Sequence, residues 1–88
     1  MKIERFEDII AWQKAKELVF MVYHDFQFCK DYSFKDQIQR AAISIMNNIA
    51  EGFERSGDKE FRNFLFISKS SCGEVRSMLY PAVHFEYI

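Results

Sequence analysis

Hydrophobic residues in the first third of the chain recur at alternating steps of three and four, the spacing of one helix face. From Ile9 onward this face holds Trp12, Ala15, Val19, Val22 and Phe26. Asp31 and Ser33 interrupt the pattern after the segment "FCK". The pattern predicts a helix over about residues 9–28.

A second stripe with the same stepping predicts a helix over residues 34–55, and it holds Phe34, Ile38, Ala41, Ile45 and Ile49. Ser33 followed by Asp36 fits a reciprocal N-terminal capping arrangement, so we expect the helix to begin there. Gly52 has two interpretations. It could be the left-handed residue that ends the helix, or it could allow another helix to approach closely. Phe53 continues the stripe and favours close packing.

A third stripe predicts a helix over residues 58–80, and it consists of Phe61, Leu65, Ser68, Cys72, Val75, Leu79 and Ala82. The preceding "RSGD" supplies a turn in which Ser56 or Asp58 can cap the helix. Pro81 lacks an amide proton and its ring clashes with the previous turn, so we expect the helix to kink or stop near Tyr80.

Three amphipathic helices with short connections predict an all-α domain over residues 1–88, built as an antiparallel up-and-down helix bundle. A fourth helix, missing or truncated here, would close such a bundle. We expect either that the natural chain continues beyond Ile88, or that a neighbouring chain covers the open groove.

Two segments, residues 18–23 and 64–67, are apolar through a complete helical turn. A helix that is apolar all round touches partners on two sides, and a chain of 88 residues is too short to surround it. We therefore expect a homo-oligomer. The predicted interface residues are Leu18, Phe20, Met21, Phe64, Phe66 and Ile67.

Polar residues line one side of the second predicted helix, and with one glutamate of the third they form what we call the polar stripe: Gln37, Arg40, Ser44, Asn48, Glu51 and Glu74. If the stripe is in water, Glu51 can pair with Arg55 one turn on. If it is buried, each group needs a partner, and the hydrogen bonds would hold helix or subunit register.

Charge does not identify a partner, because 12 basic and 13 acidic residues give a net charge of −1. A local basic set remains: Arg55, Lys59, Arg62, Lys69 and Arg76. Repeated around an oligomer, these residues could follow a phosphate backbone of RNA or DNA, although an ordinary solvated helix face would look the same. The longest apolar run, "LVFMVY", is too short to span a bilayer, and the N-terminus lacks the features of a secretory signal. We expect a cytoplasmic protein.

Catalytic signals are weak. Glu51 and Glu74 could form a carboxylate pair, but no nucleophile with a matching base is visible. His24 and His84 lack the spacing of metal ligands, and Cys29 and Cys72 are expected to be reduced core residues. No glycine-rich phosphate loop is present. We expect a protein without catalytic activity, cofactor, metal or small-molecule substrate.

Three segments resemble a known family, the small helical proteins encoded in intervening sequences of bacterial large-subunit ribosomal RNA genes. "RFEDIIAWQKAKEL" is similar to the family's opening "F-x-D-L-x-x-W-Q-x-A" pattern, and "QIQRAAISIMNNIAEGFER" to its "Q-I-R-R-A-A-x-S-I-x-x-N-I-A-E-G" segment. "DKEFRNFLFISKSSCGEV" resembles its "K-x-F-x-x-F-L-x-x-A-x-x-S-x-x-E" segment, with Ser68 where alanine is usual.

The resemblance implies an antiparallel four-helix bundle that assembles as a ring-like homopentamer. A related protein, the accessory variability factor of diversity-generating retroelements, has a similar fold and binds nucleic acid and a reverse transcriptase through basic surface. By analogy with that protein, we expect a scaffold whose basic set contacts nucleic acid. The alternative is an assembly module that binds another protein without nucleic acid.

Overall fold

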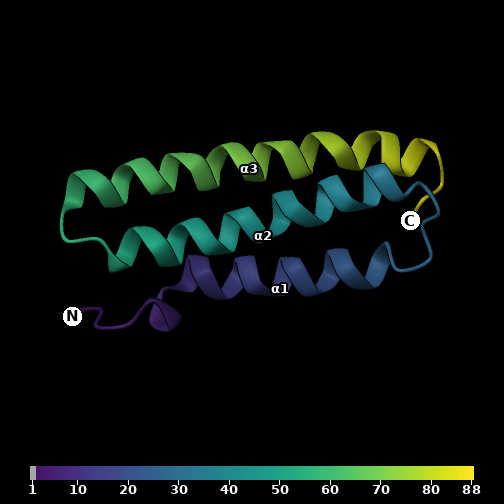
Figure 1. The fold of residues 1–88 in the computed structure, drawn as a ribbon. Coiled ribbons are helices and arrows are strands. Elements are labelled where there is room, and N and C mark those ends of the chain that lie inside the picture. The colour runs from purple at the N-terminus through teal and green to yellow at the C-terminus, as the bar shows by residue number, and fades with distance from the viewer. Residues whose placement is uncertain (1) are drawn as a thin grey trace.

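The computed structural model describes residues 2–88, and these residues form three long helices that lie side by side (Figure 1). A short 3₁₀ turn, η1 (Phe6–Asp8), precedes α1 (Ile10–Asp25), α2 (Tyr32–Glu54) and α3 (Asp58–His84). Successive helices run in opposite directions, and α2 lies between the other two. The expected all-α architecture is confirmed.

The core lies along both seams of α2. The predicted stripes of the first two helices are confirmed, and their largest fully buried side chains are Phe26 and Ile38. The third stripe is only partly buried. Ser68, Val75 and Ala82 face the core together with Met78, whereas Leu65 is 39% exposed and Cys72 is also exposed. The expectation that both cysteines are core residues is therefore wrong for Cys72.

The first helix ends at Asp25 rather than at residue 28. The Gln27 side chain donates a hydrogen bond to the His24 carbonyl at 2.9 Å, and Lys35 reaches back to the Gln27 carbonyl at 3.1 Å. These side chains satisfy carbonyl groups that a longer helix would have paired internally.

The second helix begins at Tyr32, two residues before the predicted start, and ends at Glu54. Asp31 is the N-cap, and its Oδ1 accepts a hydrogen bond from the Phe34 amide at 3.1 Å. The expected capping by Ser33 is therefore wrong. Aspartate and serine are about equally good N-caps, so the local sequence left both positions open.

Pro81 does not end the third helix, which continues to His84. Proline leaves the Ser77 carbonyl without its usual partner, but Ser77 is exposed, so water can reach that end of the turn. The following residues hold the last turn: Ala82 is fully buried, and its carbonyl accepts a hydrogen bond from Tyr87 N at 2.8 Å. At the other end of α3 the N-cap position is Gly57, not Ser56 or Asp58, and no side chain caps the helix there.

Gly52 lies inside α2 at its crossing with α3. A β-carbon placed there would lie 2.6 Å from Cβ of Phe64 and 3.0 Å from Cδ1 of Phe61. The close-packing interpretation is confirmed, because the helix continues through this position and only a hydrogen atom fits.

The helices α1 and α3 both pack on α2, but within residues 2–88 they do not pack on each other. The space between them is a groove over the face of α2. No fourth helix is present in the described part of the chain.

The N-terminal segment folds back on α1. The Phe6 ring meets Trp12 edge-on at a centroid distance of 5.1 Å, and Gln13 Nε2 donates to the Glu7 carbonyl at 2.9 Å. These contacts give a physical role to the first sequence motif, since Phe6, Trp12 and Gln13 together hold η1 against the helix.

Candidate functional site

The polar stripe follows the seam between α2 and α3, and its two ends bond differently from its middle. Near the start of α2, Gln37 Nε2 donates to Glu74 Oε2 of α3 at 3.2 Å. Both side chains are exposed, so this contact contributes little to stability by itself. The contact shows that Gln37 lies beside the turn of α3 that holds Glu74.

The middle of the stripe is a half-buried hydroxyl and amide network. Ser44 Oγ accepts from Ser71 Oγ of α3 at 2.9 Å and from Asn48 Nδ2 at 3.0 Å. Asn48 also donates to the Ser44 carbonyl at 2.8 Å, and the buried Ser68 donates to the Ile45 carbonyl at 2.9 Å. Each bond of this kind contributes about 0.5–1.5 kcal/mol. The two that join the helices, from Ser71 and from Ser68, specify one register of α3 on α2.

Arg40 and Glu51 do not take part in that network. Arg40 pairs with Asp36 at 2.8 Å within α2, and Glu51 pairs at 2.8 Å with Arg55, the residue that follows α2; all four side chains are exposed. Among residues 2–88, neither Arg40 nor Glu51 bonds directly to another helix. A contribution of these two residues to subunit register stays a prediction.

The structure separates the two glutamates that the sequence suggested as a carboxylate pair. Glu74 lies beside Gln37, which is fourteen residues from Glu51 along α2, or about 21 Å at the rise of an α-helix. They do not converge. The described residues also hold no group of three or more His, Cys, Asp and Glu side chains that could bind a metal ion.

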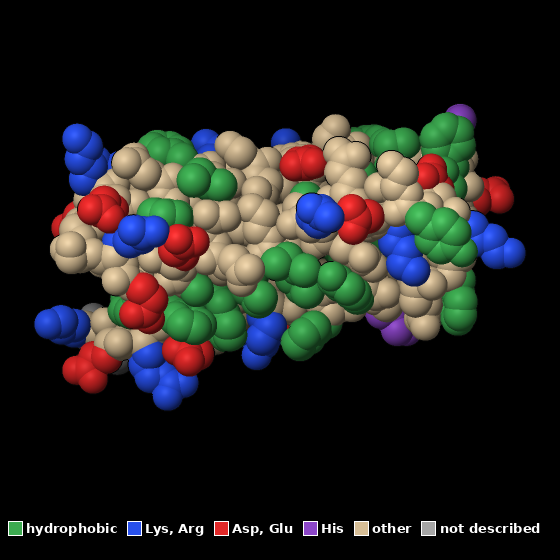
Figure 2. All heavy atoms as spheres, in the orientation of Figure 1, with side chains coloured by type: hydrophobic (Ala, Val, Ile, Leu, Met, Phe, Trp, Pro, Cys, Tyr) green, Lys and Arg blue, Asp and Glu red, His purple; other side chains and the backbone are tan. Residues whose placement is uncertain are grey.

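The basic set is divided between two environments. Arg55 pairs with Glu51 and stacks over the Phe64 ring at 5.1 Å, and Lys59 and Arg62 lie in the first turns of α3 beside Asp58 and Glu60. In contrast, Lys69 and Arg76 line hollows along the groove side of α3. Figure 2 shows acidic and basic side chains interspersed over the visible face. Nucleic-acid binding by the basic set stays a prediction.

The predicted interface residues also point in several directions. Leu18 lines the groove, and Phe64 packs over Gly52. The other four are exposed, at 63% for Phe20, 58% for Met21, 57% for Phe66 and 48% for Ile67. Large exposed apolar side chains of this kind form surface that a partner could cover.

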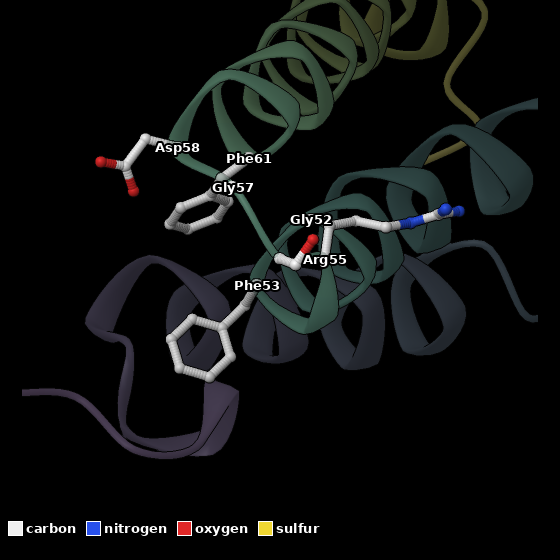
Figure 3. A pocket seen from close by; sticks show the side chains of 7 residues that line it. Gly52, Phe53, Arg55, Gly57, Asp58 and Phe61 are labelled. Atoms are coloured by element: carbon white, nitrogen blue, oxygen red, sulfur yellow. The ribbon is translucent and has the colours of Figure 1, made fainter.

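A hollow of about 430 Å³ lies at the turn between α2 and α3, and its side chains do not converge on a common point (Figure 3). Phe53 and Phe61 meet edge-on across it at a centroid distance of 6.1 Å. Arg55 and Asp58 point away from each other on opposite sides of the turn. The arrangement offers aromatic surface but no pair of polar groups that could act together on a substrate.

A hydrogen bond between Asp31 and Tyr87 joins the start of α2 to the C-terminal segment, and sequence patterns did not indicate it. The Tyr87 hydroxyl donates to Asp31 Oδ2 at 2.7 Å, and the Tyr87 ring packs edge-on against Phe34. This bond, with a smaller contribution from the Phe34 amide, lowers the pKa of Asp31 below its ordinary value. The same bond raises the pKa of Tyr87 to about 12. At neutral pH both groups are in the state that keeps the bond.

None of the helices in residues 2–88 combines the length and the apolar character that crossing a bilayer requires. His24 and His84 are both exposed, and Cys29 and Cys72 are both free thiols.

Comparison with known proteins assigns the chain to one family. The model of a family described as 23S rRNA-intervening sequence protein matches residues 7–88. No curated protein and no solved structure matches the chain. The matched region contains the contacts of Gly52 and the whole of the hydrogen-bonded network around Ser44.

Proposed function

The chain belongs to the family of 23S rRNA-intervening sequence proteins, and we propose that it acts as a non-enzymatic, homopentameric helical scaffold. The observation that carries this proposal is the exposure of large apolar side chains on α1 and α3. Phe20 and Met21 follow each other on α1, and Phe66 and Ile67 follow each other on α3. Adjacent residues on a helix point in different directions, so each helix offers apolar surface on two sides.

The residue chemistry supports a scaffold rather than an enzyme. The polar groups of the Ser44 network bond to one another where α3 packs on α2. The exposed charges of Arg40 and Glu51 pair with residues four positions away in the sequence. The motif residues with assigned contacts therefore act in folding. Self-association would bury the apolar surface that the isolated chain leaves in water.

Solution mass tests the proposal. Light scattering or sedimentation should give the mass of five chains, and Phe20→Glu with Phe66→Glu should shift that mass to the monomer, because each change places a charge in an apolar interface. His24→Glu with Ser70→Glu is the matched control, since both residues are exposed and lie one turn from the changed positions. A monomeric wild-type protein at micromolar concentration would contradict the proposal. Equal dissociation of the Phe20/Phe66 variant and of the His24/Ser70 control would contradict the assignment of the interface to Phe20 and Phe66.

A nucleic-acid surface formed by the basic set is a second candidate. Arg62, Lys69 and Arg76 repeat every seven residues on α3, and among the described residues none has an ion-pair partner. We expect single-stranded RNA to bind with an affinity that falls steeply as salt rises, and to lose binding when all three are changed to Glu. A titration followed by fluorescence anisotropy measures this. Absence of salt-dependent binding would favour the alternative, a module that binds only protein.

A further inference from the structure

The residues that follow α3, 85–88, lie against the start of α2. Figure 1 shows the chain turning at the end of α3 toward the connection between α1 and α2. Tyr87 makes the contacts there. Its hydroxyl donates to Asp31 Oδ2 at 2.7 Å, and its ring meets Phe34 edge-on at a centroid distance of 5.1 Å. One side chain therefore connects the start of one helix to the end of another.

The backbone of residues 85–88 forms a turn that its own sequence disfavours. The Tyr87 amide donates to the Ala82 carbonyl at 2.8 Å, and the Glu86 amide donates to the Val83 carbonyl at 3.1 Å. This pair of bonds is a common helix ending, and glycine usually occupies the position that Glu86 has here. Glu86 has a φ of 61°, in the left-handed region where a side chain is strained. The contacts that Tyr87 makes outside the turn offset this strain.

Asp31 connects the same contact to a buried thiol. One of its carboxylate oxygens caps α2 by accepting from the Phe34 amide at 3.1 Å, and the other accepts from Tyr87. The Cys29 thiol donates to the Asp31 carbonyl at 3.7 Å, and Cys29 is 6% exposed. Tyr87 packs against the apolar cluster that contains Cys29. Loss of the Tyr87 contact would therefore loosen the cap of α2 and uncover the thiol together.

The ionisation of Tyr87 also reflects these neighbours. The bond to Asp31, then burial, then the nearby charges of Asp31 and Cys29 raise the pKa of Tyr87 to about 12. The Cys29 thiol is therefore close to the phenol.

We propose that residues 85–88 are a latch that opens and closes as a unit over the start of α2, and that the bond between Tyr87 and Asp31 keeps it closed. In the closed state the Cys29 thiol is shielded from alkylating and oxidising reagents. Local opening of a turn at a helix end requires less free energy than global unfolding, so the thiol reacts through the open latch. This inference does not depend on self-association, because the bond lies within one chain.

The rate at which iodoacetamide alkylates Cys29 in the folded protein tests the proposal, and peptide mass spectrometry follows each thiol separately. Tyr87→Phe removes the hydroxyl and keeps the ring, so we expect Cys29 to react at least about fivefold faster. Glu86→Gly relieves the strained turn, so the Cys29 rate should fall by about threefold. The exposed Cys72 should react at the same rate in every variant.

Tyr80→Phe is the matched control. It makes the same change at a tyrosine of α3 that is 77% exposed, and it should leave the Cys29 rate unchanged. Gly52→Ala is the second control, because it disturbs the contact with Phe64 near the other end of α2. It lowers global stability without touching the latch, so it should also leave the Cys29 rate unchanged if the thiol reacts by local opening.

An unchanged Cys29 rate in Tyr87→Phe would overturn the latch. An equal increase in Tyr80→Phe would mean that the lost hydroxyl acts without its bond to Asp31, and an equal increase in Gly52→Ala would mean that global unfolding exposes the thiol. Either result would overturn the proposal as well.

Hydrogen exchange provides a separate measurement of the same opening. In Tyr87→Phe the amides of residues 34 and 87 should exchange faster by the same factor, because the latch and the first turn of α2 open together. Faster exchange at only one of these two amides would overturn their opening as a unit. All variants are compared at one protein concentration, so that self-association contributes equally to each.

Discussion

Phe26→Ala is expected to lower the free energy of unfolding by about 3–5 kcal/mol, the usual cost of removing a buried aromatic ring. Phe26 is 1% exposed and lies directly after α1, where its ring faces Phe34 of α2 at a centroid distance of 6.0 Å. Truncation removes the apolar contact and leaves a cavity between the two helices. Because small domains are stabilised by only about 5–15 kcal/mol in total, we expect a much lower urea midpoint.

Phe28→Ala is the matched control. Phe28 has the same side chain two residues further on but is 86% exposed, so its change should stay within about 0.5 kcal/mol. Urea unfolding followed by circular dichroism measures both variants, at one protein concentration because self-association would add to apparent stability. Similar losses for the two variants would contradict the burial assigned to Phe26.

The core of the first two helices could be predicted because a helix repeats its buried face every three or four residues. The periodicity alone predicted the burial of Ile38 and Ile45. Helix ends were less predictable, since groups distant in sequence determine them. Lys35 donates to a carbonyl at the end of α1, and Tyr87 holds the capping Asp31. Such contacts exist only after the helices have packed.

In the third helix, the apolar stripe does not by itself show which of its residues another helix covers. Leu65 and Val75 belong to one predicted seam, but α2 covers only Val75 and leaves Leu65 in the groove. The helix continues past Pro81 for a related reason. The local cost of proline in a helix follows from its sequence position, whereas the burial of Ala82 beyond it depends on the fold.

The sequence predicted which residues form the polar stripe but not which partners they bond to. Spacing placed Arg40, Ser44 and Glu51 on one side of α2, but residues on one side still differ in angle toward α3. Ser44 lies close enough to bond to Ser71, while Arg40 and Glu51 remain in water. The half-buried Ser71 could have been paired with Ser44 only by knowing the register of the two helices. Only the fold shows that Lys69 and Arg76 line the groove side of α3.

Gly52→Ala is expected to destabilise the protein by about 2 kcal/mol, although alanine is the better helix former. The new β-carbon would lie 2.6 Å from Cβ of Phe64, an atom fixed directly to the backbone of α3. Relief requires the two helices to separate, because rotation of the Phe64 ring does not move its Cβ. This overpacking outweighs the gain of about 1 kcal/mol that alanine brings to a helix.

Gly73→Ala separates these two effects, because the same substitution in α3 meets no atom within 4 Å. Only the gain in helix propensity remains there, so the free energy of unfolding should rise by about 0.5–1 kcal/mol. The two alanine variants should therefore shift the urea midpoint in opposite directions. A stabilised Gly52 variant would mean that α3 does not approach α2 as closely as described. Destabilisation at Gly73 would mean that another chain packs on that side of α3.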